Sequence, residues 1–280
     1  MAPGERCPLC LSPEGRAVCS GRLTLLRCAR CGAVHNASHR ALPYDSAYFN
    51  EEYRAQYGKT YVEDFDTIYN LSRGRLDLIL KMLREHGSAP GSLLDLGSAY
   101  GFFLKAAADA GFRDVTGLEI SDHAAGYCRD TFQIPVITSG FDDAALVPGF
   151  RVITAWYFLE HVPDTRSALE RITSLLEPGG IFAFSMPSLF GPQFLLHREE
   201  WCATHPEDHR VDISPRIIQR ALKAMGYRRV VTRPGGIHPS RFFPPLLAGL
   251  GAARALYSGI SKIVSFSDTM EVYAVKDKKI

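Results

Sequence analysis

The stretch that follows residue 92 constrains the fold of this chain more than any other. Residues 93–96 form a mostly apolar run, long enough for a buried parallel strand, and the run breaks at Gly97. Residues 102–108 then have the composition of a helix that ends at Gly111. Glycine lets the backbone approach a ligand closely, and the first N–H groups of a helix are free to donate hydrogen bonds. This strand, turn and helix therefore predict a cradle for a nucleotide-like ligand.

A second predicted strand, over residues 115–120, supplies an acid to this cradle. Glu119 lies at its C-terminal end, 24 residues after Asp95 in the first strand. A carboxylate at that position can accept hydrogen bonds from both ribose hydroxyls of an adenosine. The alternative is an ordinary glycine turn of an α/β domain. The turn, the helix and the acid all fall in register, however, which favours the nucleotide site.

Strands and helices alternate along the rest of the chain. Further strands are predicted over residues 134–138, 152–157, 181–184 and 227–232. Alternation of this kind predicts an α/β fold, with a mostly parallel sheet and flanking helices. Open sheets of this type bind ligands at the carboxyl ends of their strands, so the loops that follow the strands are where a site is expected.

The composition fits one large α/β domain with a small extra module. The 280 residues are 46% hydrophobic and 22% charged, and a formal net charge of +2 gives no global case for nucleic-acid binding. We see no secretory signal pattern and no apolar run of about 18 residues or more, so we expect a cytoplasmic protein. Its seven cysteines are then expected to be reduced thiols, metal ligands or core residues rather than disulfides.

Residues 1–40 carry two Cys-x2-Cys pairs. Cys7 and Cys10 form the first pair, and Cys28 and Cys31 form the second after an interval of 17 residues. Four thiolates satisfy the tetrahedral preference of zinc, so this spacing predicts a zinc ribbon. Cysteines that merely fill a core are the alternative, but 40 residues with few large apolar groups would not fold unaided.

Three other residues of the module are potential ligands that we do not assign to the metal. Cys19 is expected to be packed rather than ligating, and His35 and His39 are expected at the surface. The six arginines of the module, set against two acids and a charged zinc–thiolate centre, leave only a weak positive charge. The ribbon is therefore predicted to be structural.

Residues 41–90 read as a tyrosine-rich helical connector. Leucines and isoleucines recur at helical spacing between residues 71 and 83 and should face a core. The tyrosines are interpreted as half-buried packing residues. The functional alternative is a lid over the ligand cradle, in which Tyr57 or Tyr61 touches substrate.

Four segments together resemble the class I S-adenosylmethionine-dependent methyltransferases in order and spacing. They are Asp95-Leu96-Gly97-Ser98-Ala99-Tyr100-Gly101, Leu118-Glu119, Leu159-Glu160-His161-Val162-Pro163-Asp164 and Leu176-Glu177-Pro178-Gly179-Gly180. The resemblance covers roughly residues 90–233 and resumes in a last strand over residues 271–275. It implies a Rossmann-like, seven-stranded, mostly parallel sheet. Two positions depart from the family pattern: Ala99 replaces a glycine, and Arg151 replaces an acid at the rim.

The resemblance also implies how the cofactor would be held. Asp95, Gly97 and Gly101 would hold the methionine end and Glu119 the ribose, while the acid after the third strand, Asp142, would lie by the adenine. A solvated turn is the alternative for Asp142. The full set of predicted cofactor-binding residues is Asp95, Gly97, Ser98, Ala99, Tyr100, Gly101, Glu119, Ile120, Asp142 and Trp156.

Two histidines are candidates for a general base. Histidine is the natural choice near neutral pH, and a base is needed only if the acceptor must lose a proton. His209 matches a histidine frequently seen before the next helix of the family and is preferred, whereas His161 is more often structural or at the cofactor rim. Related quinone O-methyltransferases hold a divalent metal with Glu-x-x-Glu-His. This chain has Tyr157-Phe158-Leu159-Glu160-His161, which lacks the first carboxylate, so no metal is predicted there.

A basic segment near the C-terminus has no assigned role. Residues 210–262 contain ten Lys or Arg residues and only Asp212 as an acid. Within an insertion at about residues 235–268, a helix-like run to Val264 places apolar side chains on one stripe. It is interpreted as a helix packed on the domain, a substrate lid, or a basic helix at a membrane surface. An anionic acceptor would suit the arginines.

Three functions follow from these features. The leading one is a cytoplasmic methyltransferase acting on a small or lipid-linked molecule, such as a sugar, a quinone or another metabolite. The second is an RNA base methyltransferase that uses the ribbon for recognition, which the barely basic ribbon disfavours. The third is a non-catalytic scaffold that binds the cofactor while the ribbon recruits a partner. The acceptor itself cannot be read from the sequence.

Overall fold

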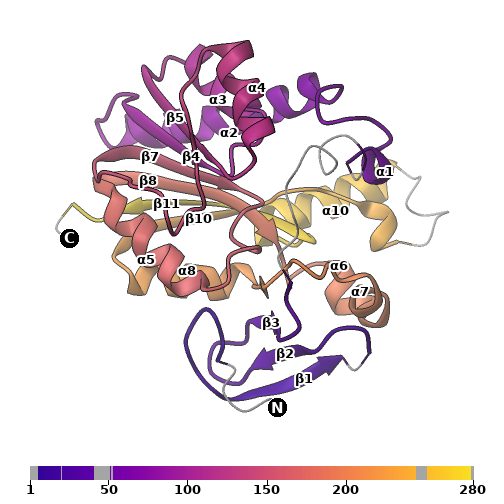
Figure 1. The fold of residues 1–280 in the computed structure, drawn as a ribbon. Helices are drawn as coiled ribbons and strands as arrows, with labels where there is room; N and C mark the ends of the chain where they lie inside the picture. Colours follow the sequence, from indigo (N-terminus) through magenta and orange to yellow (C-terminus); the bar gives the residue numbers. More distant parts are fainter. Residues whose placement is uncertain (1–5, 20, 41–50, 52, 244–250, 279–280) are drawn as a thin grey trace. The chain divides into compact units, whose positions relative to one another are not determined.

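The computed structural model describes residues 6–19, 21–40, 51, 53–243 and 251–278, and omits the side chains of residues 56 and 57 (Figure 1). The chain divides into two compact units, which are considered separately below. The first comprises residues 1–41, 157–170 and 184–274, and the second comprises residues 42–156, 171–183 and 275–280.

A seven-stranded, mostly parallel sheet forms the main scaffold, as the sequence predicts. In sheet order its strands are β10 (Tyr227–Pro234), β11 (Thr269–Lys276), β8 (Leu176–Pro187), β7 (Phe150–Trp156), β4 (Ser92–Leu96), β5 (Asp114–Glu119) and β6 (Val136–Thr138). Strand β4 is parallel to both β5 and β7, and Asp95 lies opposite Gly117 on one side and Thr154 on the other. Strand β4 is fully buried from Leu93 to Leu96, as expected for a central parallel strand.

Helices connect and flank the strands. They are α1 (Tyr53–Tyr57), α2 (Phe65–Glu85), α3 (Phe102–Asp109), α4 (Asp122–Phe132), α5 (Thr165–Leu175), α6 (Pro192–Leu196), α7 (Arg198–Thr204), α8 (Pro215–Ala224), the 3-10 turn η2 (Pro239–Arg241) and α10 (Gly251–Val264). Polar caps begin two of them: Ser121 accepts from the Ala124 amide, and Asp164 accepts from the Ser167 amide. No helix in the described ranges is both long and apolar enough to cross a membrane.

Some predicted boundaries are wrong. Strand β8 begins at Leu176 and continues to Pro187, whereas the sequence predicted a strand over residues 181–184 only. The pattern of residues 187–212 also gave no sign of helices α6 and α7. Both are short, and short helices carry too few residues for a clear apolar period.

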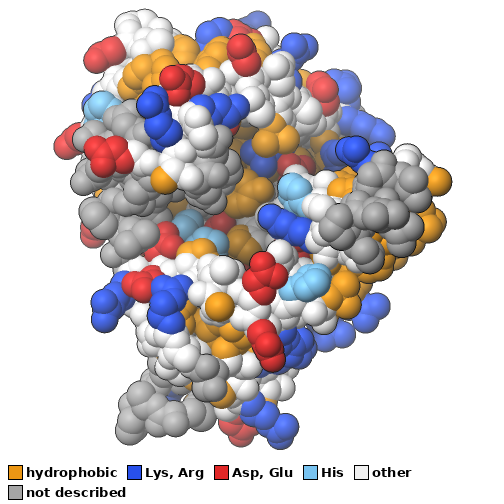
Figure 2. Space-filling model, turned by 90° about the vertical axis from the view of Figure 1, so that its right-hand side faces the viewer, with side chains coloured by type: hydrophobic (Ala, Val, Ile, Leu, Met, Phe, Trp, Pro, Cys, Tyr) orange, Lys and Arg blue, Asp and Glu red, His pale blue; other side chains and the backbone are white. Residues whose placement is uncertain are grey.

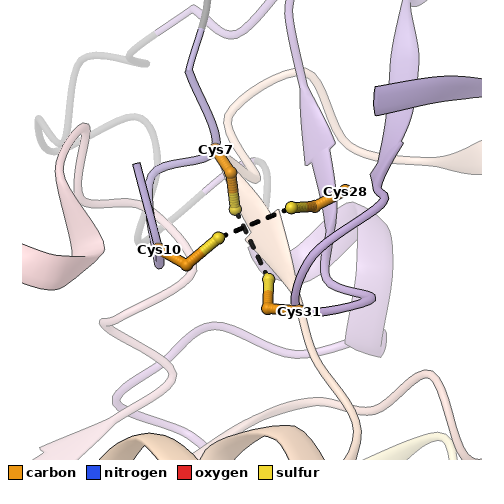
Figure 3. A group of neighbouring side chains, drawn as sticks. All are labelled: Cys7, Cys10, Cys28 and Cys31. Carbon is orange, nitrogen blue, oxygen red and sulfur yellow. Dashed lines mark hydrogen bonds between the residues drawn. The ribbon is translucent and has the colours of Figure 1, made fainter. Parts of the chain in front are cut away.

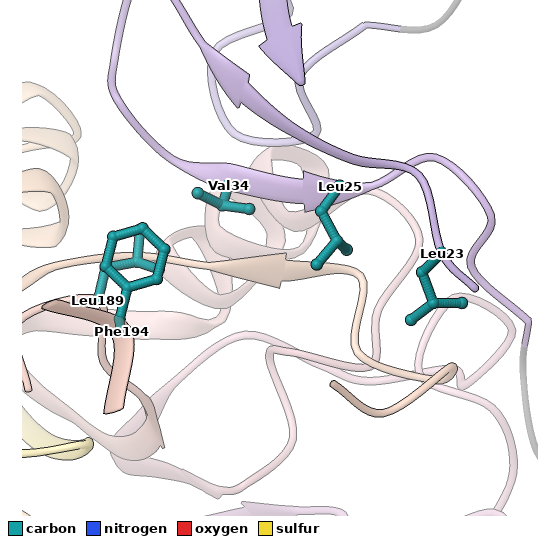
Figure 4. Packing of buried hydrophobic residues seen from close by; sticks show 5 residues of the cluster. All are labelled: Leu23, Leu25, Val34, Leu189 and Phe194. Carbon is teal, nitrogen blue, oxygen red and sulfur yellow. The ribbon is translucent and has the colours of Figure 1, made fainter. Parts of the chain in front are cut away.

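The N-terminal module forms a second, antiparallel sheet within the first unit. It contains β1 (Gly15–Cys19), β2 (Leu25–Cys28), β3 (Val34–Asn36) and β9 (Val211–Asp212). Strand β9 comes from the distant loop that carries the candidate histidines, so the module is completed by residues far outside positions 1–40. The apolar residues of the module also pack against distant parts of the chain: Leu23, Leu25 and Val34 share a buried cluster with Leu189 and Phe194 (Figure 4).

Two sequence-based expectations about this module are overturned. Cys19, expected to be a packed thiol, forms a disulfide with Cys202 of α7, with the two Cα atoms 6.0 Å apart. The expectation that all seven cysteines avoid disulfides is therefore wrong for this pair, which 183 positions of sequence separate. His35, expected at the surface, is buried at 2% exposure because it sits in β3 between β2 and β9.

Candidate functional site

The turn after β4 adopts a backbone conformation that favours glycine. Gly97, Ala99 and Gly101 have φ angles of 68°, 48° and 78°, all in the left-handed region. This region costs a non-glycine residue about 1–2 kcal/mol, so Ala99 is held there against its own preference. A side chain does not fit at Gly101, because a Cβ atom there would lie 2.1 Å from the Cys128 Sγ atom.

Hydrogen bonds attach this turn to the end of β5. The amides of Gly97 and Ser98 donate to the Leu118 carbonyl at 2.8 and 3.1 Å. Glu119 then bridges two backbone segments: one carboxylate oxygen accepts from the Ala99 amide at 2.8 Å, and the other accepts from the Ser121 amide at 2.9 Å. Burial raises the pKa of Glu119, while these amide hydrogen bonds act in the opposite direction. The turn and the ribose-binding candidate are thus held together as one piece.

Asp95 lies at the floor of the same site. Its carboxylate is buried and accepts a hydrogen bond of 2.6 Å from the Thr154 hydroxyl on β7. Burial raises the pKa of Asp95 to about 7, and the Thr154 hydrogen bond and the positive charge of Arg75 only partly offset this effect. A cationic ligand beside this buried carboxyl group would lower its pKa again, because an opposite charge stabilises the ionised form.

An aromatic cluster backs the turn. The Tyr100 side chain is buried at 2% exposure and its hydroxyl lies 2.8 Å from His123 Nε2, so this side chain points into the cluster. Tyr61 of the connector packs against the Tyr100 ring edge-to-face and stacks on Phe102, with centroid distances of 5.4 and 5.3 Å. The packing interpretation of Tyr61 is confirmed, whereas the Tyr57 side chain lies outside the described side chains.

The other predicted cofactor residues are distributed around the carboxyl ends of the strands. Ser98 is buried, Ile120 is 61% exposed, and Asp142 is exposed in the turn after β6. Trp156 ends β7 half-buried, with the Arg75 guanidinium 4.1 Å above its ring and Phe103 5.2 Å away. The second unit therefore gathers Asp95, the 97–101 turn and Glu119 closely, and the roles of Ile120, Asp142 and Trp156 stay predictions.

The first unit gathers the candidate base residues. His161 follows β7 by five residues, and its Nδ1 lies 3.0 Å from a carboxylate oxygen of Asp208. Burial acts to lower the pKa of His161, but the hydrogen bond to Asp208 and the charges of Glu160 and Asp208 outweigh it, so the pKa is raised. Asp208 itself has a pKa of about 2: burial opposes ionisation, and the His161 hydrogen bond overcomes that opposition.

His209 occupies a different electrostatic setting. Its ring packs edge-to-face on His161 with centroids 5.0 Å apart, and removal from water lowers its pKa to about 4. Nearby, His205 Nε2 lies 2.7 Å from Asp212, and both side chains are buried. His205 Nδ1 also lies 2.9 Å from the Pro206 carbonyl oxygen, so both ring nitrogens of His205 face acceptors.

A carboxyl group completes this cluster. Glu160 is buried at 1% exposure, burial raises its pKa to about 7, and its Oε2 has no hydrogen-bond partner among the described residues. Donor atoms of Glu160, His161 and His209 all lie within 4.8 Å of one another, as do those of His205, His209 and Asp212. The Glu160-His161 motif lacks a further ligand in its own segment, and His209 of a later loop lies close enough to supply one. Each of the two sets has the ligand types of a divalent-metal site.

The four cysteines converge as predicted (Figure 3). The Sγ atoms of Cys7 and Cys31 are 3.6 Å apart, those of Cys10 and Cys28 are 3.5 Å apart, and all four lie within 4.8 Å. A tetrahedral zinc ion with bonds of about 2.3 Å needs sulfur–sulfur distances of about 3.8 Å, so the cluster fits zinc. In each pair the residue after the second cysteine, Leu11 or Gly32, has a positive φ of 60° or 81°.

The ribbon contacts residues 205–212, here called the histidine loop, at several points. Arg22 pairs with Glu207 at 2.6 Å and donates to the His205 carbonyl. His39 Nε2 lies 3.1 Å from the Asp208 carbonyl oxygen. Together with the β3–β9 pairing, these contacts fix the backbone on which His205, Asp208 and His209 stand.

Sequence reasoning missed three residues of these sites. Thr154 lies within a continuous run of buried residues on β7 and faces Asp95 only because β4 and β7 are neighbours. Arg75 lies on α2 without any motif. Asp208 directly precedes His209 in the sequence. Its place in a charged loop, two residues before Arg210, was the signal that could have marked it as a partner of a histidine.

A family model described as a methyltransferase domain matches residues 68–232, which is more than half of the chain. The chain belongs to this methyltransferase family. The match includes the β4 turn, Glu119 and the segment that carries His161, so the S-adenosylmethionine-dependent methyltransferase assignment made from the sequence is confirmed at the level of the domain.

Curated relatives match over a shorter stretch. The ubiquinone biosynthesis O-methyltransferase of Methylococcus capsulatus is 33% identical over 117 residues, which are 39% of this chain and 48% of the relative. That of Aromatoleum aromaticum is 32% identical over 133 residues, which are 44% of this chain and 53% of the relative. The chain therefore spans about half the length of these curated relatives.

Solved structures share the fold at low identity. The plantazolicin methyltransferase BpumL in complex with SAH has a TM-score of 0.53 at 12% identity, covering 82% of this chain and 89% of that one. Phosphoethanolamine N-methyltransferase 2 of Haemonchus contortus in complex with S-adenosyl-L-methionine has a TM-score of 0.51 at 15% identity, covering 72% and 52%. At these identities the likeness shows the fold alone.

Proposed function

We propose that this methyltransferase transfers a methyl group from S-adenosylmethionine to a small or lipid-linked acceptor, with His161 as the general base. The observation that carries the proposal is the hydrogen bond between the Ala99 amide and Glu119. It fixes the ribose-binding acid on a left-handed turn at the carboxyl end of β4, where parallel sheets bind ligands. The match of the family model to the same stretch supports the choice of cofactor.

Each residue of the cradle has a distinct part in this proposal. S-adenosylmethionine supplies a methyl group on a positively charged sulfur, which leaves when an acceptor atom attacks in line. Asp95 would face the cationic methionine end, the 97–101 turn would approach it closely, and Glu119 would accept the ribose hydroxyls. Holding donor and acceptor in line can be worth an effective molarity of roughly 10⁵ to 10⁸ M, so positioning is the main contribution of the protein.

The sequence favoured His209 as the general base. The raised pKa of His161 and the lowered pKa of His209 favour His161 instead. A base works best when its pKa lies near the working pH, and a pKa of about 4 makes His209 a weak proton acceptor. The Nδ1 of His161 is placed to donate to Asp208, which leaves the lone pair of the neutral ring on Nε2. Asp208 would hold the ring in this tautomer and stabilise the imidazolium that forms when Nε2 takes the acceptor proton.

The relatives and the local charge support the acceptor class. The curated relatives are named as O-methyltransferases of ubiquinone biosynthesis, and one structural neighbour is named for phosphoethanolamine. The nine lysines and arginines between residues 213 and 267 suit an anionic or lipid-linked molecule. The contacts of the ribbon with the 205–212 loop support a structural role for it rather than RNA recognition.

Calorimetry and a labelling assay test the proposal together. S-adenosylmethionine should bind the wild type and lose most of its affinity in Glu119→Ala, whereas Val147→Ser, a change at an exposed position, should bind as the wild type does. When the protein and methyl-labelled cofactor are incubated with lipid, small-molecule and RNA fractions, the label should appear in the lipid or the small-molecule fraction. Unchanged cofactor affinity in Glu119→Ala would refute the cradle, and label confined to RNA would refute the acceptor class.

His161→Gln separates binding from chemistry. This variant should bind the cofactor with wild-type affinity and transfer the methyl group at a rate lower by about 10²-fold, the size of a typical general-base contribution. A wild-type transfer rate in His161→Gln would remove this residue from the mechanism.

A further inference from the structure

Helix α10 is attached to the first unit by one narrow side. Tyr257 and Ser261, one turn apart, are buried at 3% and 0% exposure. The Tyr257 ring packs near Phe242 and Phe266, with centroid distances of 5.4 and 6.0 Å. An ion pair of 3.0 Å between Arg241 and Asp268 joins the segments that precede and follow the helix. These contacts hold α10 in place without using most of its apolar residues.

A neighbouring face of α10 presents aliphatic side chains to solvent. Leu256 is 61% exposed, Ile260 47% and Ile263 83%, and the adjacent Val264 is 48% exposed. The first three lie at positions i, i+4 and i+7, so they form one stripe along the helix. Burial of aliphatic side chains is favourable, and a stripe of this kind on a monomer marks a surface that meets something apolar.

The charge of this region indicates what that partner is. From residue 213 to residue 267 the sequence contains nine lysines and arginines and no aspartate or glutamate. Two of these basic residues, Arg254 and Lys262, lie on α10 itself, and both are exposed. Figure 2 shows that orange hydrophobic and blue basic side chains share the right-hand part of the molecular surface in that view. A second copy of the chain would bring like charges together, whereas an anionic lipid surface would be attracted.

We propose that α10 is an interfacial helix that docks this protein on the surface of an anionic lipid bilayer. The exposed stripe would enter the boundary between head groups and acyl chains, and Arg254 and Lys262 would lie at the level of the head groups. Lipid acceptors or lipid-dissolved acceptors would thereby be concentrated near the enzyme. The inference does not require the proposed methyl acceptor, since it rests on the surface of the helix alone.

Vesicle co-sedimentation tests the proposal with the full chain. The wild type should sediment with vesicles of equal parts phosphatidylcholine and phosphatidylglycerol, and only weakly with phosphatidylcholine alone. Ile260→Ser/Ile263→Ser should lower the partition coefficient about tenfold or more, since two exposed aliphatic side chains are removed. Val147→Ser, which removes an aliphatic side chain of the second unit that is 78% exposed, should leave the partition coefficient unchanged.

Charge variants and a mass measurement complete the test. Arg254→Gln/Lys262→Gln should weaken binding to the anionic vesicles, and wild-type binding should fall as salt is raised, because salt screens surface attraction. Cofactor affinity should stay at the wild-type value in all variants, which separates this test from that of the methyltransferase site. Three outcomes would overturn the proposal: equal binding to both vesicle types, wild-type binding by the double serine variant, or a dimer in sedimentation equilibrium that the serine variant dissociates.

Discussion

The backbone amide of Asn36 donates a hydrogen bond of 3.0 Å to the carbonyl oxygen of Arg210. The Asn36 side chain reinforces this link, because its Nδ2 donates to the Glu207 carbonyl at 3.1 Å. The last strand of the zinc-binding module is thus hydrogen-bonded to the loop that carries Asp208 and His209. We therefore expect the order of that loop to depend on this module, which has few large apolar residues and would rely on a bound metal to fold.

Removal of zinc should consequently loosen the histidine loop. With a chelator, amide exchange in residues 205–212 should accelerate at least about tenfold together with that of the ribbon, while β4 and β5 keep their protection. Hydrogen–deuterium exchange read by mass spectrometry measures all three regions at once. Asn36→Ala, which keeps the four cysteines, should accelerate the loop and spare the ribbon. Unchanged exchange in residues 205–212 after complete loss of zinc would show that the loop is ordered independently.

Two neighbouring positions of the cofactor turn should respond in opposite ways to substitution. Ala99→Gly should raise the free energy of unfolding by about 0.5 to 1 kcal/mol, because glycine relieves the left-handed conformation and only part of that gain is lost to the greater freedom of the unfolded chain. Gly101→Ala should unfold the turn or abolish cofactor binding, since the new Cβ would meet the Cys128 Sγ atom. Thermal denaturation and calorimetry check both. A destabilised Ala99→Gly would mean that the alanine methyl contributes packing that outweighs its strain.

The contrast between these positions shows what the sequence could and could not predict. Local patterns predicted the β4 turn, its helix and Glu119, because strand, glycine and cap signals act between near neighbours. The sheet followed from the alternation of strands and helices. The pairing of His161 with Asp208, the Cys19–Cys202 disulfide and strand β9 join positions 47, 183 and more than 170 residues apart, and no local pattern encodes such contacts. The sequence therefore predicted the turn after β4 and the position of Glu119 well, and the support of the 205–212 loop poorly.

Cofactor binding should release a proton from Asp95. Burial raises the pKa of this carboxyl to about 7 in the ligand-free protein, and the positive charge of S-adenosylmethionine would lower it again. Affinity should therefore rise as the pH increases through 7, and binding at pH 7, where about half of the Asp95 carboxyls are protonated, should release about half a proton. Without cofactor the sign is the opposite: the stabilising contribution of this group is fully present below the unfolded pKa of 3.8 and is lost as pH rises through 7.

Calorimetry in two buffers with different ionisation enthalpies measures this proton release. Asp95→Asn should bind more weakly and release no proton, whereas Asp143→Asn, a change in an exposed turn, should leave the release unchanged. An identical apparent enthalpy in both buffers for the wild type would contradict the assignment of Asp95 to the cationic end of the cofactor.

The protonation of His161 should depend on Asp208. In the wild type the pKa of His161 lies above 6.5, because the Asp208 hydrogen bond and nearby negative charges outweigh burial. In Asp208→Asn the burial effect should dominate, so the pKa should fall below 6.5 and the acid limb of the transfer rate should move to lower pH. Titration of the histidine C2–H resonances by NMR follows the pKa directly, with His209→Gln as the control that removes the neighbouring resonance. A His161 pKa that stays above 6.5 in Asp208→Asn would show that Asp208 neither orients nor charges the base.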